Sequence, residues 1–190
     1  MLPVKHSFCL FISGNPASGK TTLGNYIARQ LCLPLIDKDD FLVSLFETKG
    51  IGDNTWRQTL SREADLDFIK AAQQTKSAVL VSHWRAEDGQ SLSGTPTVWL
   101  QKHFEQVIEI YCHCPNRITA QRFHERKRHA GHLDYLKDLA QLEQWFENYS
   151  QYLPLNISGL ITVDTENLAY QRTLISKINA LLVNASYIEK

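Results

Sequence analysis

Several common features are missing from this chain of 190 residues. It has no net charge, because 20 basic residues balance 20 acidic ones, so no overall positive field favours nucleic-acid binding. No apolar stretch approaches the roughly 20 residues of a membrane span, and the first apolar run leads into a glycine-rich loop rather than a signal-peptide cleavage site. Internal repeats and low-complexity segments are also lacking. We therefore expect a single domain over residues 1–190 with no membrane attachment.

Cysteine is sparse, and its four positions do not form a disulfide framework. Cys112 and Cys114 flank His113, but a C-x-C pair alone lacks the second pair of ligands that a zinc site needs. Without a secretory signal, reduced thiols are the expected state. The protein is accordingly predicted to be cytoplasmic.

A glycine-rich loop near the start of the chain carries the clearest chemistry. The apolar run Phe8–Ser13 predicts a buried strand, and Leu23, Ile27 and Leu31 lie on one face of a following helix that opens at Lys20. Between them the pattern G-x-x-x-x-G-K-T is typical of a loop whose backbone N–H groups surround a phosphate. The residues expected to bind the nucleotide are Gly14, Asn15, Pro16, Ala17, Ser18, Gly19, Lys20, Thr21 and Thr22.

Two side chains of this loop have specific expected roles. Lys20 can reach the β- and γ-phosphates of a nucleoside triphosphate, and it is a candidate catalytic residue. The Thr21 hydroxyl can ligate the Mg²⁺ that accompanies those phosphates. ATP and Mg²⁺ are therefore the expected cofactors.

The rest of the chain alternates short apolar runs with helical patterns. This order predicts an α/β fold in which helices cover both faces of a parallel sheet. Strands are expected near 8–13, 33–36, 78–82, 107–112 and 160–163. Further helices are expected over 41–47, 55–74, from Pro96 onward, 115–129, 139–152 and 167–183.

Three carboxylates follow the second expected strand, at Asp37, Asp39 and Asp40. Residues at the carboxyl ends of parallel strands line the ligand crevice, so one of these groups can accept a proton from a substrate hydroxyl and another can hold Mg²⁺ through water. The competing explanation is that Asp39 or Asp40 caps the helix over 41–47. We favour Asp39 as the catalytic base and place Asp37 and Asp40 at the substrate, without separating the three by sequence alone.

The third expected strand ends in Ser82, His83, Trp84 and Arg85. Arg85 can clamp an anionic or hydroxylated acceptor, unless it pairs with a nearby acidic residue at the surface. Together with Trp56, Arg57 and Trp84, it suggests an acceptor pocket that is partly flat and partly polar. That pocket is expected from residues 41–60 and 83–96.

A basic segment follows the fourth expected strand. Arg122, Arg126 and Arg128 can surround a triphosphate and neutralise charge that develops during phosphoryl transfer, and the first two are four residues apart on the expected helix. Gly131 could act as the hinge of a lid over about 116–134 that excludes water. A solvated charged helix face and an RNA-binding patch are the alternatives, the second weakened by the neutral charge of the chain.

The glycine-rich loop, Leu33–Phe41 and Cys114–Asp134 together resemble one group of small-molecule kinases. This group includes chloramphenicol phosphotransferase, zeta-toxin-like kinases and gluconate kinase. The resemblance implies a three-layer P-loop fold with five parallel strands in the order 2-3-1-4-5, a mobile helical lid, and transfer of the γ-phosphate of Mg·ATP to a hydroxyl group. It also assigns the base to Asp39 or a neighbour. Ser82 departs from the group, which often has an aspartate there.

The sequence therefore predicts a kinase that acts on a small-molecule acceptor whose identity is open, as is the oligomeric state. A nucleotide-dependent switch or ATPase, a nucleic-acid 5′-kinase and a nucleotide-binding domain without catalysis remain as alternatives. The switch is weakened by the lid-like basic segment, and the inactive domain is favoured only by Ser82.

Overall fold

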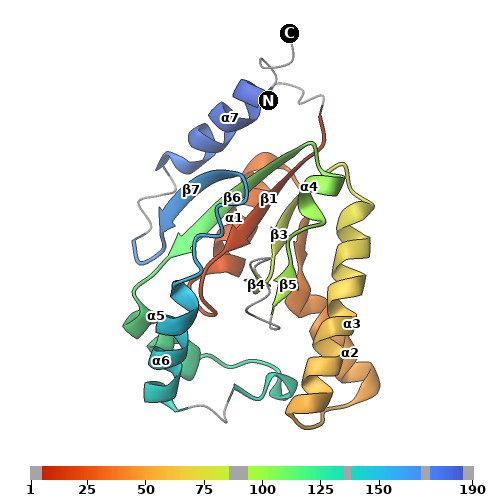
Figure 1. The fold of residues 1–190 in the computed structure, drawn as a ribbon, viewed down its shortest axis with the longest axis vertical. Coiled ribbons are helices and arrows are strands. Elements are labelled where there is room, and N and C mark those ends of the chain that lie inside the picture. The colour runs from red at the N-terminus through yellow and green to blue at the C-terminus, as the bar shows by residue number, and fades with distance from the viewer. Residues whose placement is uncertain (1–5, 86–93, 135–137, 168–171, 186–190) are drawn as a thin grey trace.

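A computed structural model describes residues 6–85, 94–134, 138–167 and 172–185. Its centre is a sheet of five parallel strands, arranged β2-β3-β1-β6-β7 (Figure 1). Counted along the chain, these strands stand in the order 2-3-1-4-5, which confirms the predicted α/β fold class. The strands are β1 (Phe8–Ser13), β2 (Leu35–Asp37), β3 (Ser77–Val81), β6 (Gln106–His113) and β7 (Gly159–Asp164).

Seven α-helices and a second, two-stranded sheet complete the described part of the chain (Figure 1). The helices are α1 (Lys20–Leu31), α2 (Lys38–Lys49), α3 (Asn54–Gln73), α4 (Leu100–His103), α5 (Asn116–Glu125), α6 (Leu139–Ser150) and α7 (Leu174–Ala185). The small sheet pairs β4 (Trp84–Arg85) with β5 (Thr95–Pro96), and Ala130–His132 form one 3-10 turn. No described helix is both long and apolar enough to cross a membrane.

Alternating side chains of the strands build two apolar cores, one on each face of the sheet. Leu10 and Ile12 of β1 pack on one face with residues of α1 and α7. Cys9 and Phe11 point to the other face, where Phe68 of α3 joins the core. Period-two alternation in a sheet covered on both sides makes both sets of positions apolar, which explains the continuous apolar run of β1.

Four expected helix boundaries are wrong, one of them the start of the last helix, which is Leu174 and not Asn167. The helix expected over 41–47 starts at Lys38, because β2 leads into it without a loop and Asp37, not Asp39 or Asp40, is its N-cap. Pro96 lies in β5 instead of opening a helix, and α4 begins at Leu100. The basic helix ends at Glu125, where the chain turns extended at Arg126. Within the expected acceptor pocket, residues 86–93 lie outside the described residues.

A fully buried carboxylate links the sheet to the segment after α6. Glu109 of β6 accepts hydrogen bonds from the Ser13 hydroxyl at 2.5 Å and from the backbone N–H groups of Leu155 and Asn156 at 2.9 and 2.8 Å. Because Ser13 immediately precedes Gly14, this carboxylate joins the chain beyond α6 to the start of the glycine-rich loop. A buried charge is tolerated only when donors satisfy it in this way.

We predict that Glu109→Ala lowers the free energy of unfolding by about 3 kcal/mol, because it removes the acceptor of the buried Ser13 hydroxyl and of two part-buried backbone N–H groups. Urea denaturation measures the change, with Glu147→Ala at an exposed position of α6 as the control. A Glu109→Ala protein within about 0.5 kcal/mol of the parent would show that the network does not stabilise the fold.

Candidate active site

The loop between β1 and α1 depends on glycine at its two ends. Gly14 has φ +134°, and a Cβ there would lie 2.7 Å from the Cys112 carbonyl oxygen and 2.8 Å from the Ser18 hydroxyl. Gly19 has φ +99° and is the N-cap of α1. Both positions lie where other residues are strained, so the loop can curl with its amides inward and meet the N-terminal end of a helix.

The Lys20 side chain folds back over this loop. Its Nζ donates to the carbonyl oxygens of Gly14 at 2.9 Å and Asn15 at 2.8 Å. Burial lowers the pKa of Lys20 to about 8, which still leaves it mostly protonated at neutral pH. A cation is therefore held at the mouth of the loop, where phosphates would attract it.

Thr21 and Asp37 bring together two oxygen ligands of the kind that Mg²⁺ prefers. The Thr21 hydroxyl donates to Asp37 Oδ2 at 2.9 Å, while Asp37 Oδ1 accepts from the backbone N–H of Asp39 and caps α2. Burial, reinforced by Asp39, raises the pKa of Asp37 to about 6. These two residues fit a Mg²⁺ ion bound with ATP, and a bound cation would compensate the buried charge.

Asp39 lies in the first turn of α2 and meets a cation from the segment that follows α5. Its carboxylate pairs with Arg128, whose guanidinium also contacts Asp134 at 3.3 Å. Burial would raise the pKa of Asp39, but Arg128 and the other nearby cations outweigh it and hold that pKa below its ordinary value. Asp39 is thus an ionised carboxylate that can accept a proton.

The three arginines of the basic segment do not form one group. Arg126 donates to Asp134 at 3.0 Å and lies over the Phe123 ring, 3.9 Å from its centre, so it belongs with Arg128. Arg122 instead contacts the sulfur of Cys114, just before the start of α5, at 3.5 Å. The shared helical face that we expected for Arg122 and Arg126 is wrong, because α5 ends before Arg126.

The segment after α5 packs around the Phe46 side chain of α2. The His129 ring stacks on Phe46 at 5.4 Å between centres, and the His132 ring meets its edge at 5.3 Å. Gly131 lies so close that a Cβ would come within 2.5 Å of the Phe46 ring. Gly131 is therefore required by this contact, which differs from the hinge role that the sequence suggested. Figure 1 shows the segment running from α5 toward the ends of α2 and α3.

Ser82 belongs to a polar network that the sequence analysis missed. Its hydroxyl lies 2.5 Å from that of Thr95, which donates to Asp65 of α3 at 2.6 Å. Asp65 in turn forms a 2.6 Å ion pair with the buried Lys38. The network provides hydrogen-bond and ion-pair partners for the buried ammonium group of Lys38, which lies between Asp37 and Asp39 in the sequence. The i and i+4 spacing of Ser61 and Asp65, both bonded to Lys38, is the signal that could have indicated it.

The residues expected to contact the acceptor range from the buried core to the exposed surface. Trp84 is buried in the core and its indole N–H donates to the Ile12 carbonyl at 2.8 Å, so the expectation that it lines the acceptor pocket is wrong. Arg85 is half-buried in β4, and Asp40 is exposed on α2. Arg57 of α3 carries a buried Nε without a partner among the described residues, and Asp134, Arg128 and Asp39 are its charged neighbours.

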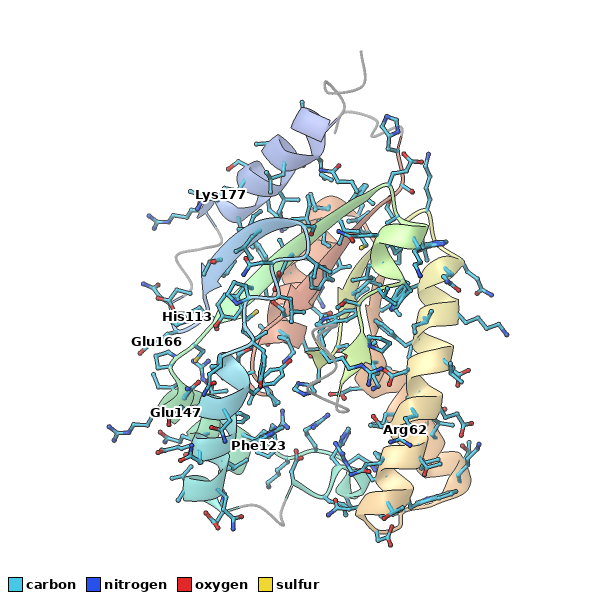
Figure 2. The ribbon with its side chains drawn as sticks, in the orientation of Figure 1. Arg62, His113, Phe123, Glu147, Glu166 and Lys177 are labelled. Carbon is cyan, nitrogen blue, oxygen red and sulfur yellow. The ribbon has the colours of Figure 1, made fainter. Side chains whose placement is uncertain are left out.

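Two hollows of about 300 and 350 Å³ lie along β7 and α7 rather than at the glycine-rich loop. Both are lined by Lys177, which Figure 2 shows on α7, well away from Phe123. None of the predicted site residues lines either hollow.

We predict that Asp37→Asn stabilises the protein in the absence of Mg²⁺ and nucleotide. A carboxylate whose pKa rises on folding loses native stability as the pH climbs from its unfolded value near 3.8 to its folded value of about 6. The loss amounts to about 3 kcal/mol above pH 6 and is absent in the amide, which can still cap α2. Urea denaturation at pH 4 and pH 7.5 measures this, and a stability difference that does not grow with pH would contradict it.

A family model described as "Shikimate kinase" matches residues 16–153, which is most of the chain. A cytidylate kinase from Pyrobaculum islandicum is 24% identical over 180 residues, covering 93% of this chain and 90% of the relative. The structure of a candidate kinase from Chloroflexus aurantiacus is 25% identical, has a TM-score of 0.75 and covers 93% of this chain and 98% of its own.

Shikimate kinase from Acinetobacter baumannii, solved in complex with shikimate, shares the fold at 17% identity and a TM-score of 0.61, with 97% and 99% of the two chains covered. The glycine-rich loop, the sheet order and the family match agree with one another. The chain belongs to the shikimate kinase family and is a P-loop kinase.

Proposed function

We propose that this protein transfers the γ-phosphate of Mg·ATP to a hydroxyl group of a small molecule. The observation that carries this proposal is the line of groups from Lys20 through Thr21 and Asp37 to Asp39 at the carboxyl ends of the strands. It sets a phosphate-binding cation, two metal-binding oxygens and an ionised carboxylate side by side. The finer likeness to chloramphenicol phosphotransferase, zeta-toxin-like and gluconate kinases remains part of the proposal.

The roles follow from the chemistry of each group. The loop amides and Lys20 bind the β- and γ-phosphates, and Thr21 with Asp37 would hold Mg²⁺, which supplies charge neutralisation at those phosphates when bound. The oxygen of the acceptor hydroxyl attacks the γ-phosphorus while Asp39 accepts the hydroxyl proton, and ADP departs as the leaving group. Arg126 and Arg128, on a lid over 116–134, face the same region and would stabilise the transferring group.

In the structure the Asp39 carboxylate is paired with Arg128. An acceptor hydroxyl must therefore compete with Arg128 for this carboxylate or displace the arginine. Arg122 lies apart from this pair, at Cys114, and its proposed contact with the phosphates requires a rearrangement of the lid. Arg85 and Asp40 remain proposed acceptor contacts. The four cysteines are all free thiols in the structure, which supports the proposed cytoplasmic location.

The charges around Asp39 favour an acceptor that is itself an anion. Arg57, Arg126 and Arg128 lie around Asp39 and Asp134, and a buried Nε of Arg57 and one of Arg126 have no partner among the described residues. Unsatisfied guanidinium donors bind carboxylate or phosphate groups with defined geometry. Relatives named for shikimate and cytidylate, both anionic, are consistent with this preference.

We predict that Asp39→Asn lowers kcat by at least about 100-fold while Mg·ATP binding changes little, because an amide cannot accept the hydroxyl proton. The control is Glu47→Gln at an exposed position of the same helix, which should stay within about threefold of the parent, and Asp40→Asn is measured beside it. Acceptor-dependent ADP release and calorimetry with Mg·ATP provide the two measurements. A larger effect at Asp40 would transfer the role of base to that residue.

A panel of matched acceptors tests the anionic preference. We expect ADP release with one of shikimate, gluconate or CMP and at least tenfold less with its uncharged counterpart, methyl shikimate, glucose or cytidine. Arg57→Gln should raise the KM for that anion about tenfold or more, with a smaller effect on kcat. Equal turnover of an uncharged counterpart would contradict the preference for an anion. Turnover of CMP alone would show that the acceptor atom is a phosphate oxygen and not a hydroxyl oxygen.

The panel also separates a kinase from an ATPase. A kinase should release little ADP until an acceptor is added, whereas a nucleotide-dependent switch should hydrolyse ATP at the same rate with and without one. Rapid release in the absence of any acceptor would therefore overturn the proposed function.

A further inference from the structure

Helices α5 and α6 form a pair with its own small apolar core. Phe123 of α5 packs with Leu142 and Phe146 of α6, and Figure 2 places Phe123 beside α6. The chain between the two helices carries Arg126 and Arg128. Because these helices share a core, they are expected to move as one unit, and the orientation of that unit determines where the two arginines lie.

The near ends of both helices meet at one residue of the glycine-rich loop. Asn15 Nδ2 donates to Asn116 Oδ1 at 2.8 Å and to Ser150 Oγ at 2.9 Å, and Ser150 Oγ donates to Asn116 Oδ1 at 3.0 Å. Asn116 is the first residue of α5 and Ser150 the last of α6. The three side chains therefore form a closed triangle of hydrogen bonds, which joins the start and end of the lid unit to the loop.

The orientation of the Asn15 amide is set by these bonds. Its oxygen, Oδ1, is buried with no partner among the described residues, which is a cost accepted only because the two N–H bonds are made. Ala17 of the same loop packs against the α5–α6 core. The loop thus contacts the helix pair through one polar and one apolar residue.

The bonding of Asn15 should also change when phosphates arrive. Its carbonyl oxygen accepts from Lys20 Nζ at 2.8 Å in the structure. If Lys20 turns to the phosphates of ATP, that carbonyl loses its donor and the peptide can adjust. Any adjustment of Asn15 reaches Asn116 and Ser150 directly, over two hydrogen bonds.

We propose that Asn116 and Ser150 are positioning residues that act through Asn15 and couple occupation of the phosphate loop to the placement of Arg126 and Arg128. This inference rests on the proposed binding of ATP at that loop. The coupling is carried by two hydrogen bonds and is expected to be about tenfold. Asn116 and Ser150 touch neither the nucleotide nor the acceptor in this proposal.

Limited trypsin digestion of the full chain tests the proposal, with cleavage after Arg126, Lys127 and Arg128 followed by mass spectrometry. In the parent protein, Mg²⁺ with the non-hydrolysable analogue AMP-PNP should slow cleavage there about tenfold. In Asn116→Ala/Ser150→Ala, the ratio of rates without and with analogue should fall to less than about twofold. Calorimetry on the same samples measures whether the analogue still binds.

The ratio distinguishes coupling from a merely structural role. If the two residues only stabilise the fold, both rates rise together and the ratio stays at the parent value, which would overturn the proposal. Asn148→Ala on the exposed face of α6 is the matched control and should keep the parent ratio. Ser150→Ala alone, a smaller change, should give an intermediate ratio even if the double variant folds poorly.

The proposed function can fail separately. If calorimetry shows that AMP-PNP does not bind the parent protein, ATP binding at the loop is wrong and the coupling falls with it. If the analogue binds but the ratio is the same in the parent and the double variant, only the coupling is wrong.

Discussion

The carboxylate of Asp37 connects two halves of the candidate site. One oxygen accepts from Thr21 at the start of α1, and the other caps α2, so a single buried group sets the distance between the phosphate loop and the helix that bears Asp39. Burial opposes its ionisation, as the raised pKa shows. The ionised Asp37 carboxylate therefore lowers the stability of the fold, and a bound divalent cation would offset this loss by neutralising the buried charge.

Buried polar networks extend this connection to the rest of the molecule. Lys38 and Asp65 tie α2 to α3, and through Thr95 and Ser82 they reach the end of β3. Glu109 joins β6 to the chain beyond α6 and to Ser13, the residue before the phosphate loop. Each network is satisfied by donors and acceptors from different elements, so the positions of the groups around the candidate site are specified by hydrogen bonds as well as by packing.

The sheet and most helices were predictable because they follow from local patterns. Short apolar runs such as Phe8–Ser13 that alternate with helical segments indicate buried strands. The glycines of the loop indicate the positions where the backbone takes positive φ values. The failures occurred where a tertiary contact decided the outcome. Trp84 looked like a pocket residue but fills the core and bonds to Ile12, and the basic helix stops at Glu125 because Arg128 and His129 reach across to Asp39 and Phe46.

By itself, the sequence determined the phosphate-binding loop, the α/β class and the cluster of three aspartates, since each depends on the order and spacing of neighbouring residues. Only the tertiary structure decided which aspartate caps α2, which arginines gather at Asp39, and that Asn15 meets Asn116 and Ser150. These facts depend on contacts between residues up to 135 positions apart. Such contacts form only when the sheet brings the ends of its strands together, and no local periodicity encodes them.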